Sequence, residues 1–267
     1  HTACRRQRQM CIRDRFIIPG IKNLKIDSQL NLNYNFESFL EGDSNRLARS
    51  AGYAVSKRPG GTSFNPLLIF GGVGLGKTHL ANAIGINVKQ AFPEKTVLYI
   101  SAEKFTQQYV DSVKKNNRND FIHFYQLIDV LIIDDVQFFS GKSGTQDVFF
   151  HIFNHLHQNG KQVVLTSDKA PVDMQEIEQR LLSRFKWGLS AELQTPDYET
   201  RISIIKNKLS RDGVEMEDDI IFYVAKHIKT NIRELEGAII SLMAQSSFNK
   251  KQILSLIHIS EPTRPYL

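Results

Sequence analysis

The chain has 267 residues, which corresponds to one or two domains at roughly 150 residues per domain. Its composition, 41% hydrophobic and 23% charged residues, excludes a disordered or fibrous protein. The longest strongly apolar stretch, around 130–133, is far shorter than the ~20 residues of a membrane-spanning helix. The sequence therefore predicts a globular protein with no membrane-spanning segment.

The net charge of +6 is unevenly distributed along the chain. Residues 1–15 carry five arginines and one aspartate, a net charge of +4, whereas residues 16–252 carry 28 basic and 26 acidic side chains. Both cysteines, Cys4 and Cys11, also lie in the opening segment. The body of the chain has no cysteine for a disulfide framework, and this favours a reducing, cytoplasmic setting.

The two ends, 1–15 and 253–267, lack the periodicity of the sequence between them and contain no apolar signal core. Both resemble in-frame translations of sequencing-adapter DNA. We therefore interpret them as artefactual or disordered tails, and expect the body, 16–252, to be a piece of a longer gene. A natural basic tail that binds nucleic acid or a membrane is the alternative.

Short apolar runs alternate with helix-period segments through most of the body. Strands are predicted at 66–70, 96–101, 130–135, 162–167 and 188–193, with helices at 77–90, 102–115, 120–127 and 145–158. Strands separated by helices are typical of a parallel sheet covered on both faces, which binds ligands at the carboxyl ends of its strands. We predict an α/β fold with a five-stranded parallel sheet.

The pattern changes after Pro196. Three helices are predicted at 197–211, 217–227 and 231–248, with no strand between them. Asn231 can cap the last of these helices, because Glu234 follows three residues later in a variant of the capping box. A strand-free bundle after an α/β core predicts a second, smaller domain that begins near residue 195.

Residues 71–78 match the pattern G-x-x-x-x-G-K-T, directly after a predicted strand and at the start of a predicted helix. The glycines let backbone N–H groups approach phosphate oxygens, and the helix N-terminus adds partial positive charge. Lys77 can reach the β and γ phosphates of a nucleotide, and the Thr78 hydroxyl can bind Mg²⁺. The predicted ATP-binding residues of this segment are Gly71, Gly72, Gly74, Gly76, Lys77, Thr78 and His79.

A second motif follows the third predicted strand, where the apolar run 130–133 leads into Asp134 and Asp135. Asp134 is the expected Mg²⁺ partner, and Asp135 can orient or polarise the attacking water. Alone, the pattern is more typical of a surface turn. Paired with a phosphate loop, it predicts the second half of a nucleotide site. A nucleotide kinase has the same loop, but that assignment leaves the helical bundle unexplained.

Several segments together resemble the AAA+ core of the bacterial chromosomal replication initiators, the DnaA family. The resemblance covers nearly all of 16–252, and the combination of SRFKWG with NIRELEG is more specific than the phosphate loop. It implies an AAA+ P-loop NTPase core, 16–194, followed by a small all-helical lid, 195–252. The segments are LNLNYNFESFLEGDSNRLA (30–48), NPLLIFGGVGLGKTHLANAIG (65–85), VLIIDDVQFF (130–139), VVLTSD (163–168), RLLSRFKWGL (180–189) and NIRELEGA (231–238).

The resemblance also implies nucleotide contacts outside the two motifs. Phe36 and its neighbours would contact the adenine, although an ordinary amphipathic helix start is the alternative. Asp168 matches the position that senses the γ-phosphate, and Arg233 matches the lid arginine that contacts phosphate. Arg184 matches the arginine finger that reaches the ATP of a neighbouring subunit, with Arg180 nearby. A solvated surface arginine is the alternative for Arg184 and for Arg233. The expected catalytic set is thus Lys77, Asp134, Asp135 and Arg184.

The segment between the second and third strands resembles the helical insertion with which initiator-type AAA+ proteins line a filament channel. Single-stranded DNA contacts are therefore expected from Val110, Lys114, Lys115 and Arg118. An ordinary solvated helix end is the alternative.

No segment resembles the family's duplex-reading helix-turn-helix domain or its N-terminal helicase-contacting domain. A net charge of only +2 in the body agrees with this.

These observations predict the ATP-binding and slowly hydrolysing AAA+ domain of a replication initiator, with ATP and Mg²⁺ as ligands. Its subunits would assemble with ATP on origin DNA and open the duplex, in the cytoplasm. Two alternatives remain open: a stand-alone AAA+ regulator or helicase loader, and a non-catalytic nucleotide-binding module.

Overall fold

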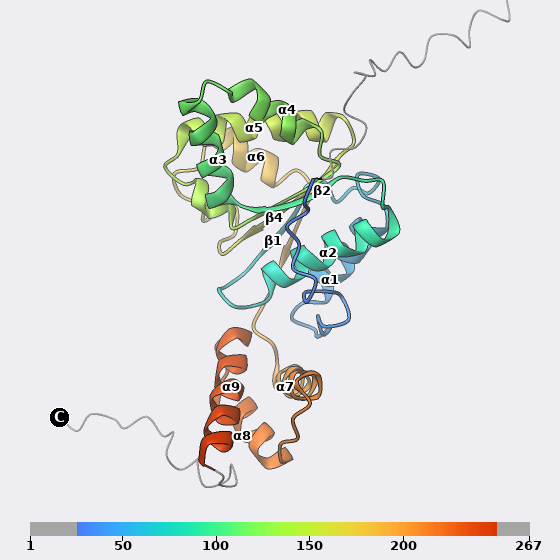
Figure 1. Ribbon diagram of the computed structural model, residues 1–267, viewed down its shortest axis with the longest axis vertical. Helices are drawn as coiled ribbons and strands as arrows, with labels where there is room; N and C mark the ends of the chain where they lie inside the picture. The colour runs from blue at the N-terminus through green and yellow to red at the C-terminus, as the bar shows by residue number, and fades with distance from the viewer. Residues whose placement is uncertain (1–25, 250–267) are drawn as a thin grey trace, which may run out of the picture.

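The computed structural model describes residues 26–249, so both terminal segments interpreted above as tails lie outside the described residues. Figure 1 shows a body of helices packed around a sheet, with three further helices below it. The elements in chain order are α1 (Arg46–Lys57), β1 (Leu67–Phe70), α2 (Lys77–Ala91), β2 (Val97–Ser101), α3 (Ala102–Lys114), α4 (Arg118–Gln126), β3 (Val130–Asp134), η1 (Val136–Phe139), α5 (Ser143–Gln158), β4 (Gln162–Ser167), α6 (Gln179–Phe185), β5 (Leu189–Glu192), α7 (Tyr198–Asp212), α8 (Asp218–His227) and α9 (Ile232–Asn249).

The five strands form one parallel sheet in the order β2-β3-β4-β1-β5, which confirms the predicted fold class. In this order, β1 lies beside β4 and β4 beside β3. The phosphate loop follows β1 and the two aspartates lie at the end of β3, so only β4 lies between the two motifs. Helices α1 and α6 were not predicted as separate elements; α6 has only 7 residues, and neither helix follows a strand directly.

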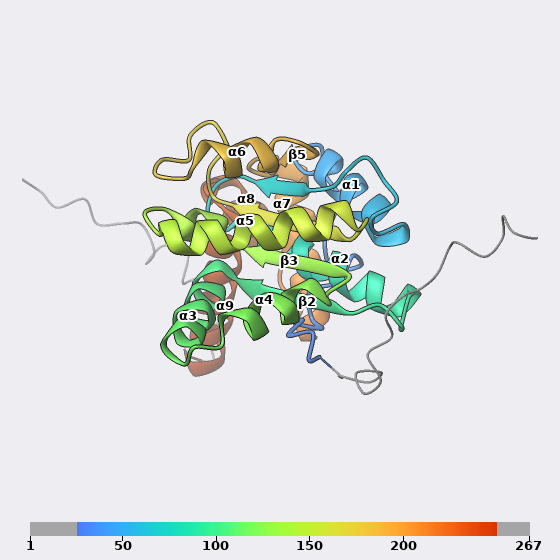
Figure 2. The same cartoon turned by 90° about the horizontal axis from the view of Figure 1, so that it is seen from above.

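Helices cover both faces of the sheet (Figures 1 and 2). Successive side chains of a strand point to opposite faces, so Leu67 and Ile69 pack with α1 and α2, whereas Leu68 packs on the opposite side. That opposite side is covered by α3, α4, α5 and α6, and its core includes Phe121 and Tyr125. The central strands are buried on both faces, which explains their continuous apolar runs.

Helices α7, α8 and α9, called here the helical segment, pack around a core of their own. This core is built from Ile205, Leu209, Ile220, Ile221, Val224, Ala225, Leu235 and Ile239. Asn231 caps α9 as predicted, since its Oδ1 accepts a hydrogen bond from the Glu234 N–H at 2.8 Å. Among residues 26–249, no helix combines the length and apolarity needed to cross a membrane.

The start of the helical segment is anchored by a buried arginine. Arg201, on α7, is only 9% exposed, and it has no carboxylate partner among residues 26–249. Its Nε donates to the carbonyl oxygen of Ala225 near the end of α8 at 2.8 Å, and its Nη1 donates to that of Pro196 at 2.6 Å. One side chain therefore joins α7, α8 and the connection that leads out of the sheet.

The Arg201 contacts predict a large loss of stability on truncation. Replacing Arg201 with alanine removes two charge-assisted hydrogen bonds and leaves two carbonyl oxygens unpaired, so we expect a loss of about 2–3 kcal/mol in the free energy of unfolding. Urea unfolding followed by circular dichroism measures this. The control is Lys206→Ala on the same helix, whose exposed ion pair with Asp218 should contribute less than about 1 kcal/mol. Equal effects of the two substitutions would contradict the anchoring role.

The turn from β1 into the phosphate loop has no room for a side chain. A Cβ added at Gly71 would lie 2.2 Å from the Leu193 carbonyl oxygen, and the φ of Gly71 is +150°, which L-residues rarely adopt. The close approach arises because β5 runs beside β1, and the Leu193 N–H donates to the Phe70 carbonyl at 2.7 Å. Gly71 is thus required by the sheet itself as well as by the loop.

Gly71→Ala should therefore destabilise the protein by about 2 kcal/mol or more, since the strained backbone and the steric clash add. Thermal unfolding of the variant gives the measurement. Gly72→Ala is the matched control, because the nearest atom to its added Cβ lies at 3.5 Å, an ordinary contact distance. Similar melting temperatures for the two variants would show that the loop relaxes freely at Gly71.

Candidate nucleotide-binding site

The predicted phosphate loop, the two aspartates and Asp168 lie together at one edge of the sheet. Residues paired in parallel register end their strands at the same level, as Phe70 does with Ser167 and as Ser101 does with Asp134. The residues that follow β1, β3 and β4 consequently emerge side by side. This edge is the one at which parallel sheets bind ligands.

Lys77 is the buried cation of this cluster, with only 5% of its surface exposed. Its Nζ donates to the carbonyl oxygens of Gly71 at 2.9 Å and of Gly72 at 2.7 Å, and forms an ion pair with Asp168 Oδ1 at 2.6 Å. Two oxygen atoms of the loop and one of Asp168 thus hold the lysine at the N-terminus of α2. A buried ammonium needs such partners, and phosphate oxygens are chemically equivalent ones.

Asp134 is a buried carboxylate, 4% exposed, that accepts three hydroxyl hydrogen bonds. Its Oδ2 accepts from Thr78 at 2.8 Å and from Tyr99 at 2.6 Å, and its Oδ1 accepts from Thr166. Burial and the neighbouring carboxylate raise the pKa of Tyr99, which keeps this hydroxyl protonated as a donor. The predicted pair Thr78 and Asp134 is therefore brought into direct contact.

Asp135 and Asp168 are bridged by Gln137, a residue that the sequence analysis did not single out. The Gln137 Nε2 donates to Asp135 Oδ1 at 3.1 Å and to Asp168 Oδ2 at 3.0 Å, while its Oε1 accepts from the Asp168 N–H at 3.2 Å. Asp135 has a left-handed backbone, with φ 59° and ψ 54°. Burial, followed by the charge of Asp134, raises the pKa of Asp135.

A cavity of about 460 Å³ lies beside the loop, within the range of sites that hold small ligands. Three parts of the chain line it: the segment before α1, the start of α2, and the helical segment. Its aromatic lining consists of Tyr34, Phe39 and the ring of His79. The helical segment contributes Asn207, Lys208 and Arg211, which no local sequence pattern had marked as site residues.

His79 is packed into the wall of this cavity, as its predicted place in the ATP site requires. Its ring stacks on Tyr34 with centroids 4.9 Å apart, and its Nε2 lies 3.0 Å from both the Asn35 carbonyl oxygen and the Ser38 hydroxyl. Burial lowers the pKa of His79, and the charge of Arg211 acts in the same direction. A neutral ring can face a nucleoside without adding a charge.

Of the segment from which an adenine contact is expected, Phe36 does not line the cavity, and its adenine contact stays a prediction. Phe36 packs edge-on against Tyr53 at 5.5 Å, near the Arg49 guanidinium, and is partly buried against the core beneath α1 and α2. Phe39, three residues later, is buried and faces the cavity instead. The segment turns at 36–38, so positions three apart point in different directions, which sequence spacing does not show.

Arg233 lies at the phosphate loop, although it comes from the last helix. The Ile232 N–H donates to the Gly74 carbonyl oxygen at 3.0 Å, and the Cβ of Arg233 lies 3.1 Å from where a Gly74 Cβ would be. Gly74 has a φ of +76°, so a residue with a side chain would be both strained and crowded there. The first turn of α9 is therefore seated directly on the loop.

Arg184 and the predicted DNA-binding residues lie outside this cluster. Arg184 contacts Asn154, Phe150 and Trp187, none of which belongs to the phosphate loop. At the end of α3 and the start of α4, all four predicted DNA-binding residues are exposed, and none of their charged groups forms an ion pair within the described part of the chain: Val110, Lys114, Lys115 and Arg118.

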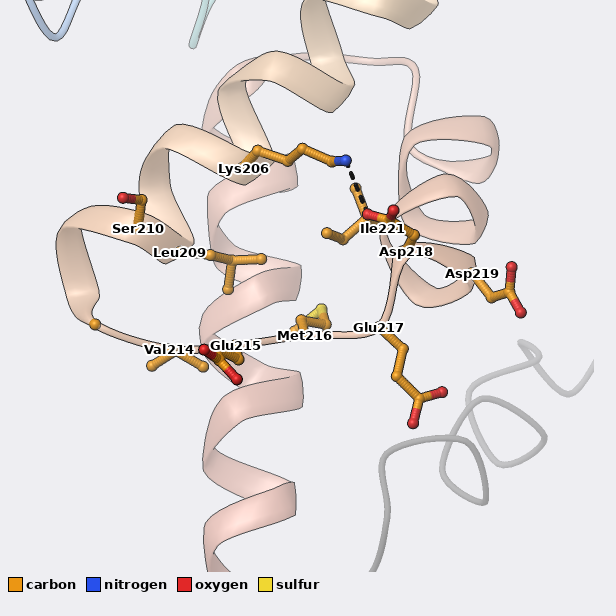
Figure 3. A pocket seen from close by; sticks show the side chains of 11 residues that line it. Lys206, Leu209, Ser210, Val214, Glu215, Met216, Glu217, Asp218, Asp219 and Ile221 are labelled. Carbon is orange, nitrogen blue, oxygen red and sulfur yellow. Dashed lines mark ion pairs between the residues drawn. The ribbon is translucent and has the colours of Figure 1, made fainter.

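A second hollow, of about 940 Å³, lies around the connection between α7 and α8 (Figure 3). Lys206 pairs with Asp218 at 2.8 Å on its rim. It holds none of the predicted site residues, and its acidic lining residues outnumber its one lysine: Glu215, Glu217, Asp218 and Asp219. Negative charge of this density opposes phosphate binding, so the hollow is no rival to the first site.

Comparison with known proteins agrees with this geometry. Residues 30–192 match the family model of the bacterial DnaA ATPase domain. The chromosomal replication initiator protein DnaA of Flavobacterium psychrophilum is 82% identical over 242 residues, which are 91% of this chain and 51% of that protein. The chain therefore spans about half the length of this curated relative.

Two solved structures are similar in sequence and in fold. Domain III of the Thermotoga maritima replication initiation protein DnaA has a TM-score of 0.80 at 45% identity, covering 84% of this chain and 92% of that one. A replication initiator DnaA bound to AMPPCP and single-stranded DNA has a TM-score of 0.75 at 40% identity, covering 80% and 66% respectively. The match to the family model covers more than half of the chain and includes the loop and the aspartates described above, so this chain belongs to the bacterial DnaA ATPase domain family.

Proposed function

We propose that the chain binds ATP between its α/β core and its helical segment and hydrolyses it slowly, as the nucleotide switch of a DNA replication initiator. The observation that supports this best is the single cluster formed by the phosphate loop, Asp134, Asp135 and Asp168 at the carboxyl edge of the sheet. Within this proposal, 16–194 is the AAA+ core and 195–252 is the lid, while 1–15 and 253–267 are tails.

The phosphates would lie over the loop, where α2 begins. Backbone N–H groups of the loop and the ammonium of Lys77 then bind the phosphate oxygens, and Asp168 orients the ammonium from the opposite side. Arg233 reaches the same phosphates from α9, because its helix is hydrogen-bonded to Gly74. The nucleoside would occupy the 460 Å³ cavity, beside Tyr34, Phe39 and His79.

Mg²⁺ fits the oxygen ligands present at this site. The Thr78 hydroxyl and the Asp134 carboxylate converge to 2.8 Å, and Mg²⁺ prefers one or two protein oxygens together with substrate phosphates. No group of three or more histidine, cysteine or acidic residues within 26–249 could hold a metal by itself, which agrees with an ion held partly by the nucleotide. When bound, the ion would neutralise charge on the transferred phosphoryl group.

Asp135 would orient the attacking water. Its raised pKa makes it a better proton acceptor than an exposed aspartate, and Gln137 fixes the direction of its carboxylate. Hydrolysis breaks the bond between the γ-phosphorus and the β–γ bridging oxygen and yields ADP and phosphate. A full set of phosphate ligands needs Arg184 of a neighbouring copy, so hydrolysis and assembly depend on each other.

Assembly with ATP would place Val110, Lys114, Lys115 and Arg118 along single-stranded origin DNA. The related initiator bound to AMPPCP and single-stranded DNA supports this assignment, as does the exposure of these residues. High identity to a replication initiator favours this role over that of a helicase loader or regulator. The proposed place of action is the cytoplasm, where a bacterial chromosome is replicated.

Two substitutions at the site should separate ATP binding from hydrolysis. Lys77→Ala removes the buried phosphate ligand, and we expect a loss of about 10- to 100-fold in ATP affinity. Asp135→Asn keeps the shape of the site but removes the proton acceptor, so binding should persist while kcat falls by about 10²- to 10⁴-fold. Titration with a fluorescent ATP analogue and a steady-state phosphate-release assay measure the two quantities.

The control for Lys77 is Lys89→Ala, at the far end of the same helix, where the side chain is exposed and contacts the Ser28 hydroxyl. It should change neither quantity. Wild-type affinity for the Lys77→Ala variant would overturn the assignment of the phosphate loop, whereas wild-type hydrolysis by Asp135→Asn would leave binding intact and remove only the catalytic role.

Single-stranded DNA binding should depend on the basic residues of α3 and α4. The triple variant Lys114→Ala, Lys115→Ala and Arg118→Ala is expected to bind an oligo-dT strand more weakly in the presence of ATP. The slope of log K against log salt should flatten by about 2, at roughly 0.7 per lost phosphate contact. Fluorescence anisotropy at several salt concentrations measures both.

A matched triple variant elsewhere controls for net charge. Lys57, Arg58 and Lys89 are also exposed, and their replacement by alanine removes the same three charges from the opposite side of the sheet. The proposal expects this variant to keep the wild-type slope. Equal losses in both variants would mean that DNA binding follows overall charge and not a site on α3 and α4.

A further inference from the structure

The two arginines of α6 differ sharply in their partners. Arg180 is paired with two carboxylates, since its Nε binds Glu178 at 2.6 Å and its Nη2 binds Asp147. Arg184, one turn later, forms no ion pair within the described residues. Its one hydrogen bond there runs from Nε to Asn154 Oδ1, at 2.9 Å. Arg184 therefore keeps a positive charge that no carboxylate in the described part of the chain offsets, whereas the charge of Arg180 is offset by two.

The guanidinium of Arg184 is nevertheless held in place by its surroundings. It lies 4.5 Å from the ring centre of Trp187 and 5.7 Å from that of Phe150. Trp187 in turn contacts the His157 ring at 4.8 Å, and His157 stacks on Phe153 at 6.1 Å with nearly parallel planes. This stack runs from Phe153 in the buried core to Trp187 at the surface, so packing against the core restricts the position of the Trp187 ring.

Trp187 is 57% exposed, which is unusual for the largest apolar side chain unless it serves a contact. An aromatic face attracts a guanidinium and restricts the plane in which it lies. The Nε hydrogen bond to Asn154 fixes the remaining rotation. Both Nη groups have no acceptor in the described part of the chain and remain available to phosphate oxygens.

We propose that Trp187 and Asn154 are positioning residues that orient Arg184 toward the γ-phosphate of ATP on a neighbouring copy of this chain. The inference rests on the proposed function of Arg184 as the finger that completes the neighbour's site. Pre-orientation matters because a flexible arginine must be ordered at the moment of reaction, whereas a stacked one is ordered already.

The absence of charge on Asn154 is important for this orientation of Arg184. An amide oxygen accepts the Nε hydrogen bond without neutralising the guanidinium. A carboxylate at the same place would form an ion pair, as Glu178 and Asp147 do with Arg180. Asn154→Asp replaces only the side-chain NH2 group by an oxygen. It should give Arg184 a carboxylate partner, as Arg180 already has.

A mixing experiment with full-length chains isolates the finger from the ATP site. The acceptor is Arg184→Ala, which keeps its ATP site and lacks the finger. The donor is Asp135→Asn, which binds ATP, does not hydrolyse it, and keeps the finger. Phosphate release above the sum of the two separate chains then measures the action of the donor's Arg184 on the acceptor's ATP.

Added to the donor, Trp187→Ala and Asn154→Asp should lower this release by about 10- to 100-fold, the scale of a misplaced catalytic group. Trp187→Phe should restore most of it, since it keeps an aromatic face. Lys186→Ala is the control, an exposed neighbour with no ion pair among the described residues, and should have no effect. ATP affinity of every donor should stay unchanged.

Trp187 is the single tryptophan of the chain, so its fluorescence reports the stack directly. Arg184→Ala should change the emission of the otherwise wild-type chain, whereas Arg180→Ala should not. This measurement needs no assembly and also verifies that the variants are folded. An unchanged emission in Arg184→Ala would overturn the stack in solution.

The outcomes of the mixing experiment are distinct. If release rises with the Asp135→Asn donor and falls with both Trp187→Ala and Asn154→Asp, the positioning role stands. If release rises equally with all donors, this inference fails while the finger role survives. If Arg184→Ala alone hydrolyses ATP like the wild type, the proposed role of Arg184 fails, and the inference with it.

Discussion

A buried carboxylate organises the site on which the rest of this structure depends. Asp134 is almost fully removed from water, and an isolated charge in that position would be strongly unfavourable. Its three hydroxyl donors come from three different elements: Tyr99 from β2, Thr78 from α2 and Thr166 from β4. Satisfying one charge therefore fixes the relative positions of the phosphate loop and of two strands.

The neighbouring charges are balanced in a second network. Lys77, buried by the loop, is paired with Asp168, and Gln137 links Asp168 to Asp135. No fully buried side-chain polar atom among the described residues lacks a partner, and the hydrogen bonds of this network run across the ends of β1, β3 and β4. A nucleotide that displaces any one of these contacts would affect the others, which suits a site that reports the state of the γ-phosphate.

The helical segment contacts the same site through its backbone as well as through side chains. Ile232 is hydrogen-bonded to Gly74, and α7 lines the cavity beside His79, so movement of the helical segment changes both the loop and the cavity. The surface that carries Arg184 lies apart from this cluster. That separation agrees with the proposal that Arg184 acts on the ATP of a neighbouring copy. Each copy's own site would then lack only this one arginine.

The sequence by itself determined the parallel sheet, the phosphate loop and the paired aspartates of this protein. Strand periodicity, the glycine spacing of 71–76 and the position of Lys77 are local properties, because a few consecutive residues specify each of them. The family resemblance added Asp168 and Arg233, and the structure places both at the loop.

Only the tertiary structure decided which other side chains reach the site. Tyr99 and Thr166 meet Asp134 because β2 and β4 both pair with β3, and no single strand specifies its neighbours. Gln137, in η1, reaches Asp168 because η1 follows β3 and lies beside the end of β4. Phe39 lines the cavity and Phe36 does not, and this depends on how the turn that carries them packs against α2. Likewise, Arg180 and Arg184 look equivalent in sequence. The structure distinguishes them, because the carboxylates of Glu178 and Asp147 pair with Arg180, whereas Arg184 has no carboxylate partner among the described residues.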